Sequence, residues 1–258
     1  MKTARLLWNG EEILRPLNDA ENWQSSALYG IPLLLPSNRT DGGKFTFEGA
    51  QYQLPINEEA NRNHLHGFLR DAAFAVTEQG ENFVSGIYEN RDEIFPFPFR
   101  IRVDCTLDED GYRQVFTIEN IGVGNMPLSF GLHTNFAEKD GFQVPLDRCC
   151  VTNERHIPTG ELAQLNARQR QYSQGMKTDG GSVNGFYTAA GHCARIGNME
   201  YVVSENFDHW ILFNRGGKQG FLSVEPQCGG VNVLNSKNGL CILASGEKEV
   251  FRTCIRPV

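Results

Sequence analysis

Apolar and polar residues alternate over long stretches of this 258-residue chain. Three segments, residues 44–56, 99–120 and 199–214, carry apolar side chains at every second position. A period of two is typical of strands that bury one face and expose the other. Within the second segment, LDEDGYRQVF predicts a hairpin whose turn is centred on Glu109–Gly111. The pattern therefore predicts antiparallel strands joined by tight turns.

Helical periodicity is rare by comparison. The best candidate for a helix is ELAQLNARQRQYS, residues 161–173. The 27 glycines and 11 prolines suit many tight turns, and no linker, low-complexity tract or internal repeat divides the chain. We therefore predict one all-β domain over residues 1–258, built as a large antiparallel β-sandwich of two packed sheets.

Composition narrows the kinds of partner. A net charge of −7 argues against nucleic acid or an anionic membrane surface as the main partner. No window is long and apolar enough to span a bilayer, and the first residues, MKTARLLWNGEEILRPL, contain no run typical of a secretory signal. We therefore expect a small-molecule partner and a cytoplasmic location.

The seven cysteines are odd in number and include no CxxC spacing. This usage is typical of reduced thiols in a cytosolic protein, and we expect most of them in the core. No pair of cysteines has the spacing of zinc ligands. No glycine-rich phosphate loop precedes a helix. We therefore predict neither a metal nor a cofactor.

Four short stretches combine polar groups with turn residues. They are PSNRTDGG (36–43), NHLHGF (63–68), SFGLHTNF (129–136) and LSVEPQCGG (222–230). Each follows or interrupts a strand-like pattern. Side chains that are far apart in sequence could therefore converge on one face of a sandwich.

The histidines in these stretches have more than one interpretation. If their segment is extended, His64 and His66 share one strand face. Such a pair could bind a metal, but no carboxylate set accompanies it, and a polar pair in a loop explains it equally well. His133 lies between Leu132 and Thr134, a setting in which a histidine is more often structural.

The charged candidates are Glu225 and Arg39. Glu225 ends an apolar strand on the face opposite Val224, and burying an unpaired carboxylate is costly, so we expect a partner or a chemical role. Arg39 follows the apolar run LLLPSN and is either a binding group or a surface arginine at a turn. Carboxylate, imidazole and guanidinium groups suit proton transfer without a cofactor. A non-catalytic carbohydrate-binding module could use the same side chains.

The order of these motifs resembles that of the aldose 1-epimerases, the galactose mutarotase-like proteins. The resemblance rests on LYGIPLLLPSNRTDGGKFTFEGAQYQLPINE, NHLHGF, the long hairpin that runs into SFGLHTNF, IPTGEL, LSVEPQ and LASGEKEVFRTCIRPV. It implies a large antiparallel supersandwich. It also implies a cofactor-free reaction that interconverts the α and β anomers of an aldose.

The resemblance also implies a role for each candidate. Glu225 would be the general base on the anomeric hydroxyl, and His133 the general acid on the ring oxygen. The ring opens to the aldehyde, the C1–C2 bond rotates and the ring closes again. His66 and Arg39 would bind sugar hydroxyls, and His64 is a weaker candidate that supports His66.

The chain also departs from the family pattern. Galactose-type members carry an aspartate–histidine pair whose aspartate contacts the sugar. The corresponding stretch here, residues 182–191, has no aspartate, and Asp208 in FDHW is the nearest substitute. Asn135 stands where many members have an aromatic residue. Candidate stacking surfaces for a pyranose ring are Trp210, Phe68 and Phe136.

Two alternatives stay open. A hexose 6-phosphate would need a cationic clamp, whereas the same residues could simply be solvated loop charges. The clamp candidates are Arg62, Arg70 and Arg215 with Lys218. A sandwich that binds sugar without converting it is a different class, and it has no need of a matched acid and base such as His133 and Glu225.

Overall fold

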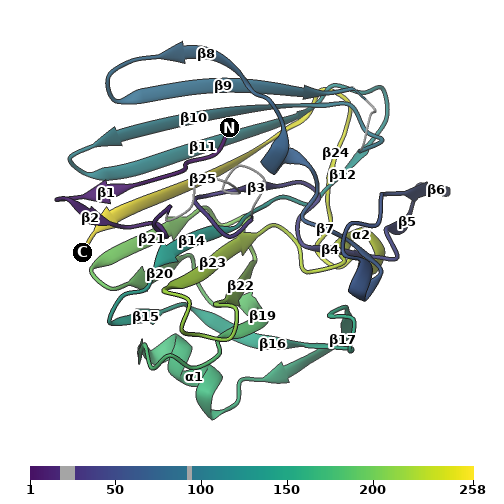
Figure 1. Ribbon diagram of the computed structural model, residues 1–258. Coiled ribbons are helices and arrows are strands. Elements are labelled where there is room, and N and C mark those ends of the chain that lie inside the picture. Colours follow the sequence, from purple (N-terminus) through teal and green to yellow (C-terminus); the bar gives the residue numbers. More distant parts are fainter. Residues whose placement is uncertain (18–26, 92–94) are drawn as a thin grey trace.

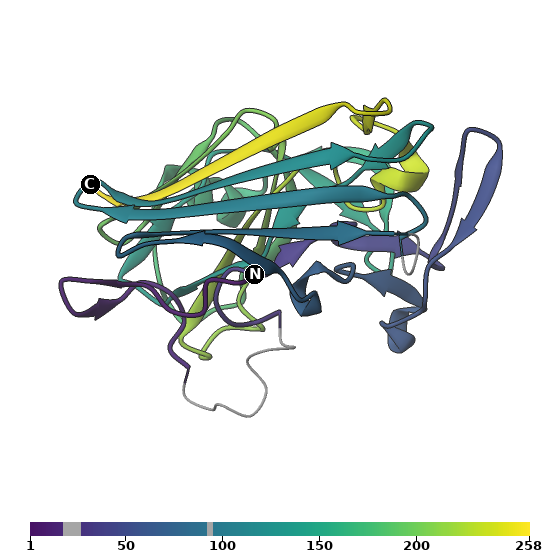
Figure 2. The same cartoon turned by 90° about the horizontal axis from the view of Figure 1, so that it is seen from above.

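The computed structural model describes residues 1–17, 27–91 and 95–258. Two large antiparallel sheets, one of nine strands and one of eight, contain most of the strand residues that the structure describes. Figure 1 shows the long strands of the nine-stranded sheet above β23, β22, β19 and β16 of the other sheet, and Figure 2 shows the same molecule from above. The architecture confirms the prediction of a large antiparallel β-sandwich.

The strand orders define the two layers. The nine-stranded sheet runs β18 (Met176–Lys177), β15 (Gly141–Gln143), β20 (Cys193–Ile196), β21 (Met199–Val203), β25 (Lys248–Pro257), β11 (Gly111–Asn120), β10 (Phe99–Asp108), β9 (Phe83–Asn90) and β8 (Ala75–Gln79). The eight-stranded sheet runs β17 (Pro158–Gln164), β16 (Leu146–Thr152), β19 (Asn184–Ala189), β22 (His209–Phe213), β23 (Phe221–Gln227), β13 (Gly131–Leu132) and β3 (Leu33–Leu34), with β14 (Thr134–Ala137) also paired to β23.

Shorter elements surround the sheets. Strand pairs are β1 (Leu7–Trp8) with β2 (Glu11–Glu12), β4 (Arg39–Asp41) with β7 (Asn63–Leu65), β5 (Lys44–Phe47) with β6 (Ala50–Gln53), and β12 (Met126–Leu128) with β24 (Cys241–Leu243). The helices are η1 (Glu59–Asn61), η2 (Leu69–Asp71), α1 (Ala167–Gln174) and α2 (Val233–Ser236). In the part of the chain that the structure describes, no helix has the length and apolarity needed to cross a membrane.

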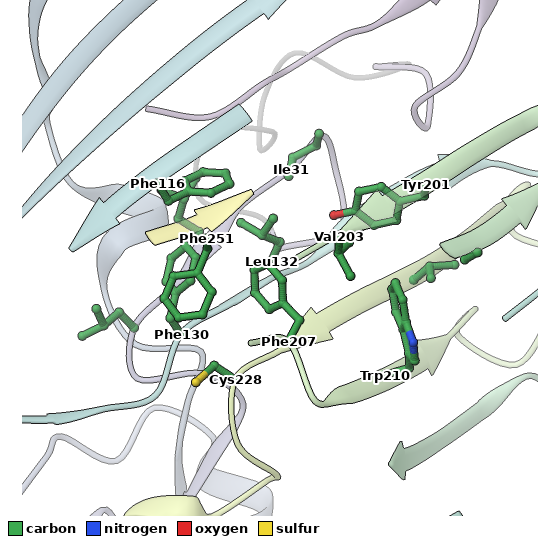
Figure 3. Packing of buried hydrophobic residues seen from close by; sticks show 14 of the residues in the cluster. Ile31, Phe116, Phe130, Leu132, Tyr201, Val203, Phe207, Trp210, Cys228 and Phe251 are labelled. Atoms are coloured by element: carbon green, nitrogen blue, oxygen red, sulfur yellow. The ribbon is translucent and has the colours of Figure 1, made fainter. Parts of the chain in front are cut away.

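The hydrophobic core lies between the two sheets. Along β10 the residues Phe99, Ile101 and Val103 are buried and alternate with partly exposed ones, as the period of two predicted. Rings from both layers meet in Figure 3, where Phe116 packs on Phe130 with ring centroids 5.4 Å apart. Contacts of this kind contribute free energy beyond the apolar area that they bury.

Two local predictions can be compared with the structure. The hairpin is confirmed, because Asp108 pairs with Gly111 around a two-residue turn. The helix predicted at 161–173 is wrong at its start. Residues Glu161–Gln164 belong to β17, which pairs with β16, and α1 begins only at Ala167. Its capping box, in which Asn166 and Gln169 bond each other's backbone, fixes that boundary.

All seven cysteines are free. Only Cys105 and Cys228 are buried, and Cys193 is exposed. The expectation that most cysteines lie in the core is therefore wrong, because the other strand cysteines occupy half-buried positions.

Strand β23 positions the site. It is hydrogen-bonded to β22 on one side and to β13 and β14 on the other, and all of its residues are buried. Leu222 and Val224 belong to the hydrophobic core. The alternation of a strand therefore places Ser223, Glu225 and Gln227 on the opposite face.

Candidate functional site

A carboxyl group and an imidazole meet on that opposite face. Glu225 lies on β23, and His133 lies between β13 and β14. Glu225 Oε1 is 3.3 Å from His133 Nε2, and the two side chains are only 2% and 4% exposed. The structure therefore brings the two predicted catalytic residues into direct contact.

Burial shifts the protonation of both groups. Burial raises the pKa of Glu225 to about 8, although the charge of Arg39 and a hydrogen bond from Gln227 act in the opposite direction. Burial lowers the pKa of His133 to about 4, although its hydrogen bond with Asn135 favours the charged form. Near pH 7 the pair therefore carries one proton that both groups can hold.

His66 lies beside this pair. Its ring centroid is 5.2 Å from that of His133, and the two ring planes meet at 83°. Burial, followed by the repulsion that a protonated His66 would meet whenever His133 is also protonated, holds the pKa of His66 well below its ordinary value, so its imidazole is neutral near pH 7. His66 can therefore offer a neutral hydrogen-bonding group to a ligand.

A left-handed turn places His66. Strand β7 ends at Leu65, and His66 has φ 65° while its N–H donates to Asn38 O at 2.8 Å. Gly67 also has a positive φ, and a Cβ there would clash with the carbonyl of Leu35. The glycine therefore lets the chain return closely past Leu35, and it aims the preceding histidine at the site.

The same turn corrects the prediction for His64. Because the extended backbone stops before His66, the two histidines do not share one strand face. His64 is buried, its Nδ1 lies 2.7 Å from Pro55 O, and it does not line the pocket that contains His66. Its placement is that of a structural residue that supports the β4–β7 pair.

Arg39 on β4 is held by a carboxylate. Its Nε donates to Glu58 Oε2 at 2.9 Å, its NH2 group donates to Glu58 Oε1 at 2.7 Å, and its NH1 group donates to Asn38 Oδ1 at 3.2 Å. Burial acts to raise the pKa of Glu58, but hydrogen bonds from Arg39 and Asn63 outweigh it and keep that pKa below its ordinary value. The guanidinium is therefore fixed in orientation and keeps two N–H groups for a ligand.

These side chains open onto one pocket of about 320 Å³. Its lining residues are Ala27, Leu28, Asn38, Arg39, Leu65, His66, Arg70, His133, His156, Asn184, Phe186, Ile211, Phe213, Arg215 and Glu225. Polar groups that form hydrogen bonds and two aromatic rings, Phe186 and Phe213, share this lining. Such a mixture of polar and apolar surface is typical of small-molecule sites.

Several lining residues were missed from sequence. Asn184 and Phe186 come from the very stretch 182–191 that was noted for lacking an aspartate. His156 directly precedes the IPTGEL motif and was not considered. All three lie in or directly beside stretches that the sequence analysis had quoted, and this proximity is the feature that could have identified them.

Arg155 brings His156 to the pocket. It donates through Nε to Asn61 O at 2.9 Å and through NH2 to Asn63 Oδ1 at 3.0 Å, and it pairs with Asp41 at 2.7 Å. These contacts tie the loop between β16 and β17 to the β4–β7 region. His156, with φ 60°, then lies at the pocket rim.

Asp208 is not brought to this pocket. Its Oδ1 accepts from His209 Nδ1 at 2.8 Å and from the N–H of Gly229 at 2.7 Å. Asp208 therefore orders the turn that follows β23, and the prediction that it binds substrate is not supported by its placement among the described residues.

The proposed stacking residues also lie elsewhere. Trp210 and Phe136 are buried in the core, each with its ring against Tyr201, and Phe68 packs against Tyr88. Of the predicted phosphate clamp, Arg70 and Arg215 line the pocket, whereas Arg62 and Lys218 do not. Over residues 1–17, 27–91 and 95–258, no three His, Cys, Asp or Glu side chains group so as to hold a metal ion.

Known structures define the class of the fold. A galactose mutarotase-like protein from Clostridium acetobutylicum matches with a TM-score of 0.87 at 23% identity, covering 95% of this chain and 85% of that one. Galactose 1-epimerase from Lactobacillus acidophilus NCFM matches with a TM-score of 0.78 at 15% identity, covering 99% of this chain and 87% of that one. The fold is therefore that of the galactose mutarotase-like proteins.

Sequence comparison gives the family. The sequence model described as aldose 1-epimerase matches residues 4–256, and the chain belongs to the aldose 1-epimerase family. The uncharacterised protein YihR of Escherichia coli strain K12 is 25% identical over 260 residues, which cover 95% of this chain and 83% of that protein. The family match confirms the resemblance that the motif order indicated.

Proposed function

We propose that this protein is an isomerase that interconverts the α and β anomers of an aldose. Glu225 takes the proton of the anomeric hydroxyl, and His133 gives a proton to the ring oxygen. The observation that carries this proposal is the buried contact of 3.3 Å between His133 and Glu225 on the wall of the pocket.

One internal proton transfer prepares both groups. Their roles require a carboxylate at Glu225 and an imidazolium at His133, whereas burial favours the two neutral forms. Moving the proton from Glu225 to His133 Nε2 gives both reactive forms without changing the net charge of the pair. The charge of Arg39 favours the carboxylate, and the hydrogen bond with Asn135 favours the imidazolium, so both neighbours lower the cost.

The reaction then follows from geometry. As Glu225 removes the proton from the hydroxyl on C1, His133 protonates the ring oxygen, and the bond between C1 and the ring oxygen breaks. Rotation about C1–C2 turns the other face of the aldehyde to the ring hydroxyl. On closure, Glu225 gives its proton to the aldehyde oxygen and His133 takes back the proton of the ring hydroxyl, so both groups recover their starting forms. A well-placed acid or base contributes about 10²–10⁴-fold to such a step.

The remaining lining residues hold the sugar. The free N–H groups of Arg39 and the neutral imidazole of His66 bind hydroxyls, which fixes C1 against the acid–base pair. Phe186 and Phe213 offer apolar surface to the less polar face of a pyranose ring. His156 and Asn184 add polar contacts at the rim.

The test is polarimetry of freshly dissolved α-D-glucose and α-D-galactose, with and without the protein. We expect the protein to speed the approach to anomeric equilibrium. The substitution Glu225→Gln should lower kcat by about 10²–10⁴-fold. The matched control Glu205→Gln makes the same chemical change at an exposed position and should keep full activity. A fully active Glu225→Gln variant contradicts the mechanism, and sugar binding without acceleration favours a non-catalytic binding protein.

An anionic aldose such as a hexose 6-phosphate is a second candidate substrate. The observation that favours it is the position of Arg70 and Arg215, two cations that both line the pocket. Arg70 pairs through Nε with Asp71 at 3.0 Å and is half-buried, while Arg215 is exposed at the turn after β22. Guanidinium groups suit the oxygen atoms of a phosphate.

This candidate is tested by comparing glucose 6-phosphate with glucose. If the phosphate is recognised, Arg215→Gln should lower kcat/KM for glucose 6-phosphate by up to about tenfold and leave glucose unchanged. Lys218→Gln, which removes a nearby exposed charge outside the pocket, is the matched control. An equal effect of Arg215→Gln on both sugars would reject the phosphate clamp.

A further inference from the structure

The amide of Asn135 has a single possible orientation. The residue is fully buried on β14, two positions after His133. Its Nδ2 donates to the carbonyls of Ala27 at 2.9 Å, Gly30 at 3.2 Å and His133 at 2.7 Å. Only the amino end of an amide can donate to carbonyl oxygens. Oδ1 must therefore be the atom on the other side.

That oxygen faces two donors. It accepts a hydrogen bond from Ser223 Oγ at 2.7 Å, and it lies 3.1 Å from His133 Nδ1. Because an amide oxygen accepts and never donates, Nδ1 of His133 must carry a hydrogen. In a neutral imidazole the other nitrogen, Nε2, then holds the lone pair, and this is the atom 3.3 Å from Glu225 Oε1.

We propose that Asn135, itself held by Ser223 and by backbone carbonyls, is a positioning residue that fixes the tautomer of His133 and makes Nε2 the atom that exchanges the proton. The second half of this proposal rests on the proposed function. With the opposite tautomer, a lone pair on Nδ1 would oppose the oxygen of Asn135, and Nε2 could not accept the proton of Glu225. The site would then lack its internal proton transfer.

The position of Asn135 supports a role specific to this chain. It stands where the family resemblance led us to expect an aromatic residue, and an aromatic ring has no acceptor equivalent to an amide oxygen. Its neighbour Ser223 pairs with it across β14 and β23, so both side chains lie on the face of the sheet that carries Glu225. The arrangement is built into the register of the two strands.

The first test reads the tautomer directly. In the full protein with ¹⁵N-labelled histidine, NMR near pH 7 should show the His133 ring with a protonated Nδ1 and an unprotonated Nε2. The signal is assigned by its loss in His133→Gln. A ring protonated at Nε2, or an equal mixture of tautomers, overturns the proposal. This measurement needs no activity, so a protein with the expected tautomer and no anomerase activity supports the tautomer assignment and contradicts the proposed function.

The second test removes the acceptor. Asn135→Leu should give a mixture of tautomers and lower kcat by about tenfold or more, with KM within about twofold. Asn135→Asp, which restores an acceptor oxygen, should recover the single tautomer. If either variant fails to fold, the spectrum of the unchanged protein still decides the proposal. A folded Asn135→Leu variant with the original tautomer and full kcat overturns it.

A control on the same strand separates positioning from simple stability. Thr134 is also fully buried, and its Oγ1 lies 2.9 Å from the hydroxyl of Tyr201 on the other face of the sheet. Thr134→Val should lower the stability of the protein but leave the tautomer of His133 and kcat unchanged. A shift of the tautomer in this control would contradict a specific role for Asn135.

Discussion

The two walls of the pocket are built in different ways. Glu225 and His133 lie on or between strands at the centre of the eight-stranded sheet, where backbone hydrogen bonds run on both sides. We call this the catalytic wall. Arg39, His66 and His156 come from the short β4–β7 pair and from the loop between β16 and β17. We call this the binding wall, and Figure 1 shows β4 and β7 to one side of β14 and β23.

The two walls also differ in backbone conformation. His66, His156 and Arg215 of the pocket lining all have positive φ, at 65°, 60° and 52°, whereas neither His133 nor Glu225 does. Left-handed backbone costs free energy in residues other than glycine, and it persists only where the surroundings impose it. Under the proposed mechanism, the residues that transfer protons have ordinary backbone, whereas two of the three proposed sugar contacts on the binding wall, His66 and His156, have left-handed backbone. The binding wall is therefore the part that can change with the substrate.

The largest effect is expected on the catalytic wall. Glu225→Gln and His133→Gln should each lower kcat by about 10²–10⁴-fold, and the double variant should lose little more than the worse single variant. The reason is that the two groups share one proton and act as a unit. The rate of anomer exchange, measured by polarimetry or NMR, is compared for the two single variants and the double variant. Effects that multiply would show that the two residues act independently.

The buried carboxyl of the catalytic wall should make the free energy of unfolding depend on pH. The pKa of Glu225 is raised from 4.5 to about 8, so the folded protein binds this proton more tightly than the unfolded chain does. The stability that this carboxyl contributes is complete below pH 4.5 and is lost as the pH rises through 8. The glutamine of the Glu225→Gln variant cannot ionise, so the variant does not lose this stability as the pH rises. The difference in free energy of unfolding between the variant and the unchanged protein should therefore shift in favour of the variant by about 2–4 kcal/mol between pH 4.5 and 9.

Urea unfolding at pH 4.5, 7 and 9 measures this difference. The pKa of His133 is lowered from 6.5 to about 4, so its contribution has the opposite sign and is lost as the pH falls from 6.5 through 4. The variant His133→Gln therefore serves as the control. A Glu225→Gln variant whose relative stability does not change with pH would show that the carboxyl is not desolvated.

The binding wall is best tested at its turn. Gly67→Ala combines a positive φ of 60° with a clash against the backbone of Leu35. Gly42→Ala is a matched control, because its φ is 59° but nothing lies within 4 Å of the added Cβ. We expect Gly42→Ala to cost about 1–2 kcal/mol of unfolding free energy, and Gly67→Ala to cost about 1–3 kcal/mol more. Equal losses in thermal or urea unfolding would show that the close approach to Leu35 is unimportant.

The smallest effect is expected at the rim. His156→Ala removes an exposed side chain that lines the pocket without touching the catalytic pair. KM should rise by about two- to fivefold, which corresponds to the weak contribution of a single exposed contact, and kcat should stay the same. A loss of kcat comparable to that of His133→Gln would mean that the two walls are not separate.

Much of the catalytic wall could be predicted from sequence. The alternation in FLSVEPQ placed Glu225 opposite Val224, and the structure confirms that it is a buried carboxyl on a central strand. The same period of two predicted the sandwich and its long hairpin. These predictions succeed because strand faces follow directly from position in the sequence.

The binding wall could be predicted only in part. His66 was placed by the family motif, but its separation from His64 depends on a positive φ that no residue pattern encodes. His156 reaches the pocket through contacts of Arg155 with Asn61 and Asn63, some ninety residues away in sequence. The residues Glu161–Gln164 joined a strand because β16 was available as a partner. Tertiary contacts of this kind override local preference, and a single sequence does not reveal them.

The burial of β23 has a consequence for motion. Its amide groups are bonded to neighbours on both sides and are shielded from water, so their hydrogen exchange should require opening of the sheet itself. The carboxyl and imidazole then keep their spacing through the fast fluctuations that affect exposed turns. Under the proposed mechanism, heating should abolish proton transfer only when the sheet unfolds cooperatively.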